Sequence, residues 1–300
     1  MMSTTRKRPR DATDEERQRL EDARRHASVD LSCPGAGHFR IEDNAHTQSI
    51  KELLQGIVHH FGQLGGVTWG EGSHDEDPRR RMYGFLPGQQ QKLLDMGIKI
   101  QKEGAPNDEE HDWTVQNACV NLAFASGKGR NGDKKNDASI AQDQDTNALV
   151  LDSKIWDALH SITKRVHDLV PTAYKRFATM EELVAAQPNL HNGASYLPAH
   201  LDYPRNDGFG VIIVTISIHG NGDIVLIDDG DEGVNQAVSY SFTVRENECY
   251  FLCGDARNKC VHGVLCSTDN QECQRQTLNL RYGLHSAEFA DSEVNQHWNE

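Results

Sequence analysis

The sequence predicts an α+β fold that is mainly β in its second half, an antiparallel sandwich or jelly roll with the earlier helices packed on one side. Short runs of β-branched and aromatic residues follow one another after residue 189, and Gly, Asn and Asp divide them. Amphipathic helical patterns occur only before that point. Consecutive strands with turn signals and no crossover helices are typical of antiparallel sheets.

The composition is that of a folded protein with an acidic balance. Of 300 residues, 37% are hydrophobic, and 31 basic against 45 acidic side chains give a net charge of −14. This charge excludes a chain that coats nucleic acid indiscriminately. No apolar run is long enough to span a bilayer, and the N-terminus carries charges in place of a signal core. We expect an intracellular protein, cytoplasmic or nuclear, with no membrane partner.

The first 30 residues differ from the rest of the chain. They carry eight basic and seven acidic side chains and few large apolar ones, which predicts a charged, disordered extension with a loose helix over residues 14–26. The basic run at residues 6–10 is either a nuclear-import signal or a solvated tail. We expect residues 31–300 to form a single domain, with helical support and loops over 31–188 and the jelly-roll core over 189–285.

Three helices are expected in the supporting part. Apolar residues recur at three- and four-residue steps over residues 46–64 and again over 155–169, which ends before Pro171. Thr179 and Glu182 have the spacing of a capping box and predict a third helix there. Six strands are expected in the core, over residues 211–218, 223–227, 238–244, 248–253, 261–266 and 277–282.

The seven cysteines indicate a reducing compartment, because their number is odd and the C-terminal five form no C-x-x-C pair. Cys249 and Cys253 share strand parity with Phe251, so we expect them to be small buried hydrophobes. A structural zinc site is the alternative, although such sites usually have closer paired spacing. The five are Cys249, Cys253, Cys260, Cys266 and Cys273.

Three residues have the pattern of a metal site. On an extended segment, His200 and Asp202 lie on the same face, so an imidazole and a carboxylate can hold one metal ion. With His262, which follows several strands later, they match the 2-His-1-carboxylate triad of non-haem iron oxygenases. Taken by itself, the His200–Asp202 pair is also consistent with a surface hydrogen bond between the two side chains. Taken by itself, His262 is also consistent with a buried core histidine that has no role in metal binding.

The last strand carries a polar face. Over residues 275–281 polar and apolar residues alternate, so one face bears the four polar residues and the other bears Leu278 and Leu280. Two arginines on one face of a buried strand are costly to desolvate unless anions meet them. A dicarboxylate is the natural partner, because a guanidinium binds a carboxylate through two parallel hydrogen bonds. The polar residues are Arg275, Thr277, Asn279 and Arg281.

Together these motifs resemble the AlkB-like iron(II)- and 2-oxoglutarate-dependent dioxygenases. The resemblance covers roughly residues 189–283, and it is weaker over residues 81–85 and in the helix before Pro171. It implies a double-stranded β-helix core, with iron(II), 2-oxoglutarate as co-substrate and O2. It further implies that the iron ligands are His200, Asp202 and His262, that Arg275 pairs with the distal carboxylate of 2-oxoglutarate and that Arg281 supports the same pocket.

The sequence departs from the family pattern at two places. The family strand reads Arg-x-Asn-x-Thr-x-Arg, whereas Thr277 and Asn279 are exchanged here and both stay inward and polar. The family often has Asn-x-Tyr upstream, with the tyrosine on the co-substrate, and here Asn189 and His191 stand at those positions. Tyr196 is the residue that the sequence offers in place of the family's co-substrate tyrosine. We therefore expect Thr277, Asn279, Asn189 and Tyr196 among the residues that bind the co-substrate.

The activity that the resemblance implies is oxidative hydroxylation or demethylation of a nucleic-acid base, with release of succinate and CO2. Such enzymes take the base out of the stack, so local basic residues suffice to hold the nucleic acid. Oxidation of a protein side chain or small molecule is the alternative, which suits the 6 basic and 16 acidic residues over 196–300. A non-catalytic binding module is disfavoured, because the metal triad and both arginines are present. The basic residues are Arg79, Arg80, Arg81, Lys128, Arg130, Lys134 and Lys135.

Overall fold

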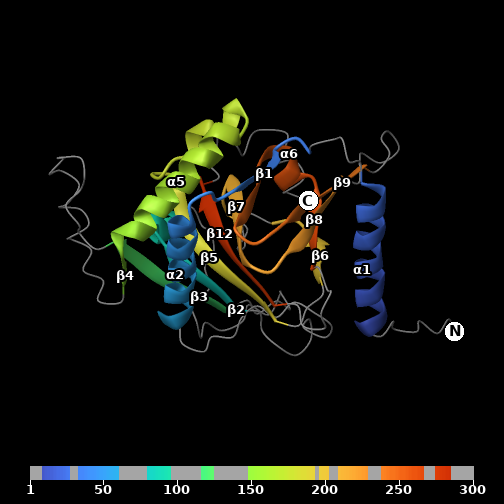
Figure 1. Cartoon of the computed structure of the whole chain (residues 1–300), viewed down its shortest axis with the longest axis horizontal. Coiled ribbons are helices and arrows are strands. Elements are labelled where there is room, and N and C mark those ends of the chain that lie inside the picture. The colour runs from blue at the N-terminus through green and yellow to red at the C-terminus, as the bar shows by residue number, and fades with distance from the viewer. Residues whose placement is uncertain are drawn as a thin grey trace.

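The computed structural model describes residues 9–27, 33–60, 80–95, 116–124, 148–192, 196–202, 209–228, 238–266 and 274–284, which form two β-sheets with helices outside them (Figure 1). The larger sheet has the order β1-β10-β7-β12-β5-β2-β3-β4, and the smaller has the order β6-β11-β8-β9. The strands of the larger sheet are β1 (Ala36–Arg40), β2 (Arg80–Phe85), β3 (Gln116–Phe124), β4 (Leu149–Leu151), β5 (Leu183–Asn192), β7 (Ile212–His219), β10 (Glu248–Leu252) and β12 (Gln274–Tyr282). Those of the smaller sheet are β6 (Tyr196–His200), β8 (Gly222–Asp228), β9 (Val238–Val244) and β11 (Val261–Cys266).

The connectivity from β5 onward is that of a double-stranded β-helix, the jelly roll that the sequence predicts. β5, β7, β10 and β12 belong to the larger sheet, β6, β8, β9 and β11 belong to the smaller, and every pair among them is antiparallel. All six expected strands are present, with ends that differ by a few residues. The core begins at Leu183, earlier than expected, and the larger sheet continues through the parallel strands β2, β3 and β4.

The helix expected after Thr179 is wrong. Thr179 follows the short 3-10 helix η1 (Thr172–Phe177), and the chain enters strand β5 at Leu183. Residues 183–189 are all buried, and β5 pairs with β12 along almost its whole length. A capping box is a local signal, and here the pairing of a buried strand with β12 overrides it.

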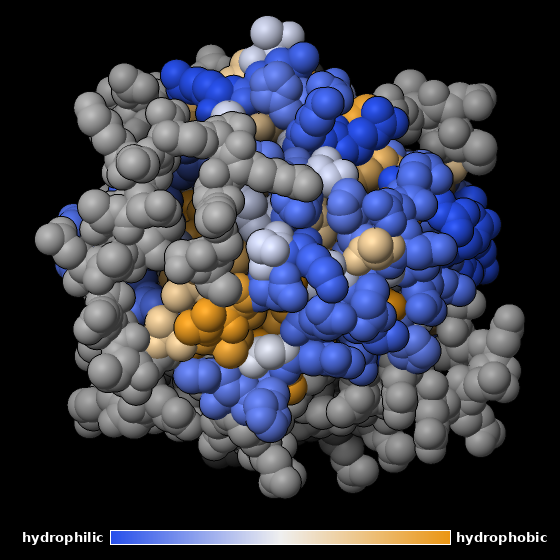
Figure 2. Space-filling view, turned by 60° about the vertical axis from the view of Figure 1, so that its left-hand side comes forward, coloured by the Kyte–Doolittle hydropathy of each residue, from blue (hydrophilic) through white to orange (hydrophobic). Residues whose placement is uncertain are grey.

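Helices α2 (Asn44–His60) and α5 (Ser153–Leu169) cover the outer face of the larger sheet, as expected for the two amphipathic patterns. The side chain of Asp152 caps α5 by accepting a hydrogen bond from the Lys154 backbone N–H at 2.9 Å. Apolar side chains of both helices form one core cluster with alternate residues of β7, β10 and β12, among them Ile216 and Leu280. Figure 2 turns this side forward and shows a mainly hydrophilic surface over the described residues.

A third long helix, α1 (Pro9–His26), packs on the opposite side of the molecule, against the smaller sheet (Figure 1). Leu20 is fully buried in a cluster with Tyr196 and Val225. The helix is longer than the loose helix expected over 14–26, and it packs on the sheet through the buried Leu20 while most of its described side chains are exposed. Helices therefore flank both sheets instead of one side, while the division of the chain at residue 30 stays a prediction.

Two short α-helices are α3 (Gln89–Asp95) and α6 (Gly254–Asn258), and the latter interrupts the strand series between β10 and β11. Cys249 and Cys253 are fully buried beside Phe251, which confirms their expected role as small hydrophobes. The cysteines whose side chains are described form no disulfide, and none of them belongs to a metal-binding group. They are Cys33, Cys249, Cys253, Cys260 and Cys266. Across the described part of the chain, no helix is long and apolar enough to cross a membrane.

Candidate functional site

The expected triad comes together where β6 and β11 pair. His200 ends β6 and stands directly opposite His262 in the antiparallel register, and Asp202 follows two residues later. The Nε2 atoms of His200 and His262 lie 3.8 and 3.9 Å from the two carboxylate oxygens of Asp202. One ligand atom from each residue lies within 4.8 Å of the others, and this is the one such group among the described residues.

Both imidazoles direct Nε2 toward the carboxylate of Asp202. Nδ1 of His200 lies 2.8 Å from the carbonyl oxygen of Pro198, which can only accept, so Nδ1 is the donor there and Nε2 is the atom left for a metal. Burial, with the neighbouring His200, lowers the pKa of His262 to about 3. His262 is therefore neutral at physiological pH, with Nε2 toward the carboxylate.

Asp202 is the negative charge of this group. Burial by itself would raise the pKa of the Asp202 carboxyl, but the guanidinium of Arg281, the two imidazoles and the guanidinium of Arg257 outweigh it and hold this pKa well below its usual range. Arg257 is fully buried on α6. A mostly buried carboxylate flanked by two imidazoles is a ligand set that fits a divalent transition metal.

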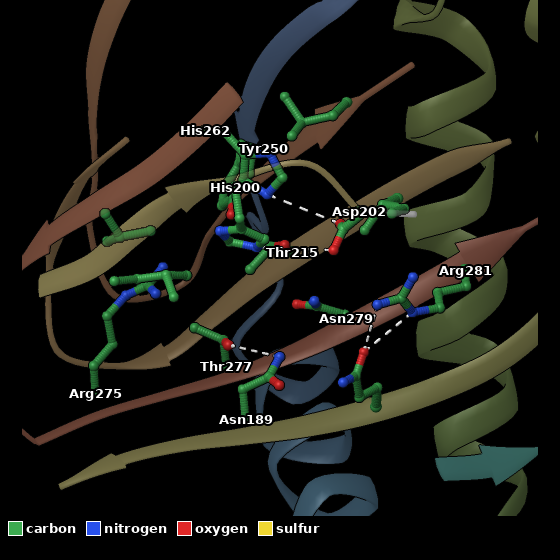
Figure 3. Close-up of a pocket in the computed structure, with 15 residues that line it drawn as sticks. Asn189, His200, Asp202, Thr215, Tyr250, His262, Arg275, Thr277, Asn279 and Arg281 are labelled. Atoms are coloured by element: carbon green, nitrogen blue, oxygen red, sulfur yellow. Dashed lines mark hydrogen bonds and ion pairs between the residues drawn. The ribbon is translucent and has the colours of Figure 1, made fainter. Parts of the chain in front are cut away.

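The triad opens on a pocket between the two sheets (Figure 3). Its volume is about 50 Å³, room for roughly four water molecules. The smaller sheet contributes His262 and Val264, and β12 of the larger sheet contributes its whole polar face. Leu278 and Leu280 point the other way, into the helix-covered core. The predicted alternation over residues 275–281 is thus present. The β12 residues in the pocket are Arg275, Thr277, Asn279 and Arg281.

The guanidinium of Arg275 is buried and can still donate hydrogen bonds. The residue is 2% exposed, and among the described residues its Nε and Nη2 atoms have no hydrogen-bond partner. Leaving two buried guanidinium nitrogens without acceptors is costly, and a carboxylate has the geometry to satisfy them. The hydroxyl of Tyr250, on β10, makes hydrogen-bond contacts with Thr215 and with Arg275. Arg275 and Tyr250 therefore form one polar corner of the pocket.

The expectations did not include Tyr250, although the sequence held a signal for it. Cys249 and Phe251 face the helix-covered core, so strand parity turns Tyr250 to the inner face. Tyr196, the substitute that was expected, does not line the pocket, and it packs beside Leu20 under α1. That expectation is corrected: a register shift between β6 and β11 breaks the alternation along β6, so Leu197 and not Tyr196 lines the pocket with His200.

Arg281 is engaged differently from Arg275. Its Nε and Nη2 atoms donate to Oε1 of Gln187 at 3.1 and 2.7 Å, and Nη1 donates to the carbonyl oxygen of Phe209 at 2.8 Å. Its guanidinium carbon lies 5.2 Å from the centre of the Phe209 ring. These contacts fix the side chain within the protein.

The other expected residues lie in or near the pocket. Asn189 and Thr277 are buried and 3.5 Å apart, with the Asn189 amide donating to the Thr277 hydroxyl. Oδ1 of Asn279 is buried without a partner among the described residues. The side chains of His191, Arg80 and Arg81 lie outside the described residues, although their backbones belong to β5 and β2. Arg79, Lys128, Arg130, Lys134 and Lys135 lie outside the described residues altogether.

The comparisons with known proteins give weak likenesses. No family model and no curated protein matches the chain. A 2OG-Fe(II) oxygenase family oxidoreductase from Burkholderia pseudomallei is similar in structure over 34% of this chain and 45% of its own, with 18% identity and a TM-score of 0.25. OsALKBH1 is similar over 45% and 66%, with 12% identity and a TM-score of 0.31.

A third solved structure is similar over a greater length. The non-heme alpha ketoglutarate dependent epimerase SnoN from nogalamycin biosynthesis aligns over 91% of this chain and 88% of its own, with 13% identity and a TM-score of 0.36. The chain spans less than two thirds of the length of the first two proteins. Likeness at these values carries no argument about activity, so the activity is argued from the site itself.

Proposed function

We propose that the protein is an iron(II)- and 2-oxoglutarate-dependent dioxygenase. The observation that carries the proposal is one pocket with a His–Asp–His group at one end and the buried Arg275 at the other, where Nε and Nη2 have no partner among the described residues (Figure 3). The donor set fits iron(II), because two neutral imidazoles and a carboxylate leave coordination positions open. Arg275 fits the distal carboxylate of a short dicarboxylate whose other end reaches the metal.

Each residue has a defined task in this proposal. His200, Asp202 and His262 hold the metal, and the bond from His200 Nδ1 to Pro198 orients its ring. Arg275 and Tyr250 bind and orient the co-substrate, while Val264 and Leu252 help to exclude water. Iron(II) with 2-oxoglutarate and O2 supplies the oxidising chemistry, which converts the co-substrate to succinate and CO2 and inserts oxygen into the substrate.

The metal assignment is tested by removing the carboxylate of the triad. Asp202→Ala should abolish iron-dependent formation of succinate from 2-oxoglutarate, whereas Asp168→Ala should leave it unchanged. Asp168 is a matched control, because it too lies near a histidine, His167, at 3.9 Å, but on the exposed end of α5. Unchanged turnover in a folded Asp202→Ala variant would contradict the proposal.

For the substrate, we propose a methylated nucleic-acid base. The motif resemblance to AlkB-like enzymes supports this choice, and the basic residues near 79–81 and 128–135 supply possible phosphate contacts. Oxidation of a protein side chain or small molecule is the competing substrate class, favoured by the acidic balance of residues 196–300.

Formaldehyde and succinate release should be compared on methylated DNA, methylated RNA and methylated peptides. The proposal expects formaldehyde from an oligonucleotide, with binding that weakens as salt rises. Formaldehyde from the peptides alone, or succinate without any response to oligonucleotides, would contradict the nucleic-acid substrate while leaving the dioxygenase assignment intact.

A further inference from the structure

The two inward arginines of β12 are not equivalent. A guanidinium can pair with a carboxylate through the edge formed by Nε and Nη2. On Arg281, both of these atoms donate to Oε1 of Gln187. On Arg275 the same two atoms have no partner among the described residues. One arginine is therefore free to receive a ligand, and the other is already bound within the protein.

The third hydrogen bond of Arg281 reaches Phe209, which follows the proposed metal ligand Asp202 in the chain. Phe209 is the first described residue after Asp202, and its carbonyl accepts from Nη1 of Arg281. Two residues on, the Val211 backbone N–H donates to the carbonyl of Tyr282 at 2.7 Å. The end of β12 thus holds Phe209 and Val211, which follow Asp202 in the chain.

Arg281 and Asp202 line the same pocket, so the positive guanidinium and the proposed carboxylate ligand face one cavity. Gln187 is 3% exposed on β5, where it stands opposite Asn279 of β12. It is a neutral acceptor, so it holds the guanidinium without cancelling the charge that Asp202 experiences.

We propose that Gln187 is a positioning residue of the metal site, which acts by holding Arg281 between Asp202 and Phe209, and that Arg281 does not bind the co-substrate. This inference rests on the proposed function and revises the role expected for Arg281. In this proposal the Gln187–Arg281 pair supports binding of the metal, whereas Arg275 and Tyr250 bind the co-substrate.

The test separates these two affinities in the full-length chain. Calorimetry measures cobalt(II) binding to the metal-free protein, and then 2-oxoglutarate binding to the cobalt-loaded protein, with no turnover. The variants are Gln187→Leu, which removes the acceptor at similar volume, Gln187→Glu, which keeps an acceptor, and Arg275→Met. Gln187→Asn, which withdraws the acceptor by one methylene, replaces the Leu variant if that one does not fold.

We expect Gln187→Leu to weaken cobalt binding by about 10- to 100-fold, the usual effect of losing a partner that orients a metal ligand. Its 2-oxoglutarate affinity, once loaded, should stay within about twofold, because Arg275 is untouched. Gln187→Glu keeps an acceptor for Arg281, so it should weaken cobalt binding less than Gln187→Leu does. Arg275→Met should show the reverse pattern, with cobalt binding retained and 2-oxoglutarate binding weakened.

Hydrogen exchange gives a readout independent of any ligand. In metal-free Gln187→Leu, the amides of residues 209–211 should exchange faster than in the unchanged chain, and in Arg275→Met they should not. Equal cobalt affinity in the Leu or Asn variant, or equal weakening in the Leu and Glu variants, would overturn the inference. So would a loss of 2-oxoglutarate affinity in Gln187→Leu that matches Arg275→Met. An unchanged chain that binds no cobalt would instead contradict the proposed function.

Discussion

Arg275 and Arg281 project from the same face of β12, yet Arg281 donates to Gln187 and Phe209 while Nε and Nη2 of Arg275 have no partner among the described residues. The unsatisfied guanidinium lies in a pocket that a metal-binding group closes at its other end. Leaving buried guanidinium nitrogens without acceptors is costly, and a bound anion would remove that cost. The proposed binding end of the pocket is therefore at Arg275.

Tyr250 offers a sharp test of this corner. Tyr250→Phe removes only the hydroxyl that contacts Thr215 and Arg275, so we expect the KM for 2-oxoglutarate to rise about tenfold, equivalent to ~1.4 kcal/mol. Tyr240→Phe is the control, because Tyr240 lies on β9 and does not line the pocket. A KM that rises equally in both variants would show that the effect is not specific to the pocket.

Gly222 offers a steric test of the same corner. A Cβ at this position would lie 3.2 Å from Nε of Arg275 and 2.9 Å from Cγ1 of Val264, so Gly222→Ala crowds the guanidinium. We expect weaker 2-oxoglutarate binding, by about fivefold or more, with unchanged cobalt(II) affinity. Gly56→Ala on α2, where a Cβ makes only ordinary contacts, should change neither affinity. Calorimetry of both variants checks the prediction, and unaltered 2-oxoglutarate binding in Gly222→Ala would contradict it.

The buried His262 predicts a loss of stability in acid. Its pKa falls from 6.5 to about 3 on folding, so between these values the unfolded chain binds a proton that the folded chain does not. The contribution is fully present above pH 6.5 and is lost as the pH falls. For the metal-free protein, the free energy of unfolding should drop by about 2 kcal/mol more between pH 7.5 and pH 5 than it does in His262→Gln.

Urea unfolding of the metal-free protein at the two pH values measures this difference. His262→Gln removes this titrating group, so the difference between the two pH dependences reports the contribution of His262. Parallel pH dependence in the two proteins would show that His262 is not buried in its neutral form.

Leu20 tests whether α1 belongs to the folded unit. Leu20 is fully buried, and its side chain lies against Gly263, next to the proposed ligand His262. Leu20→Ala should weaken the packing of α1 by ~2–4 kcal/mol, because it leaves a cavity on the smaller sheet. Limited proteolysis should then cut within α1 sooner, whereas the exposed Gln18→Ala should behave as the unchanged chain. Equal cutting rates would contradict the packing of α1.

Patterns that repeat along one strand were predictable from the sequence. Alternation over residues 275–281 is a period-two signal, so the inward set of Arg275 to Arg281 follows from the pleat of any half-buried strand. The spacing of His200 and Asp202 carries the same information. The strands at 211–282 were found because β-branched runs and turn residues are local signals.

Elements that depend on distant partners were not predictable in this way. β1 lies at the edge of the larger sheet through its pairing with β10, more than 200 residues later, and it has no alternating pattern of its own. The failed helix after Thr179 has the same cause, because β12 recruits that segment as a strand. Local propensity is weaker than the burial of a whole strand.

The sequence by itself determined the strands of the jelly-roll core, the shared face of His200 and Asp202 and the inward arginines, because each is encoded in a spacing along one segment. His262 was predicted from the order of the motifs along the chain. Only the tertiary structure decided that Tyr250 rather than Tyr196 faces the pocket, and that Gln187 occupies Arg281 while Arg275 stays open. The physical reason is that a hydrogen bond between two strands depends on their register, and the pairing of β5 with β12 sets that register across nearly a hundred intervening residues.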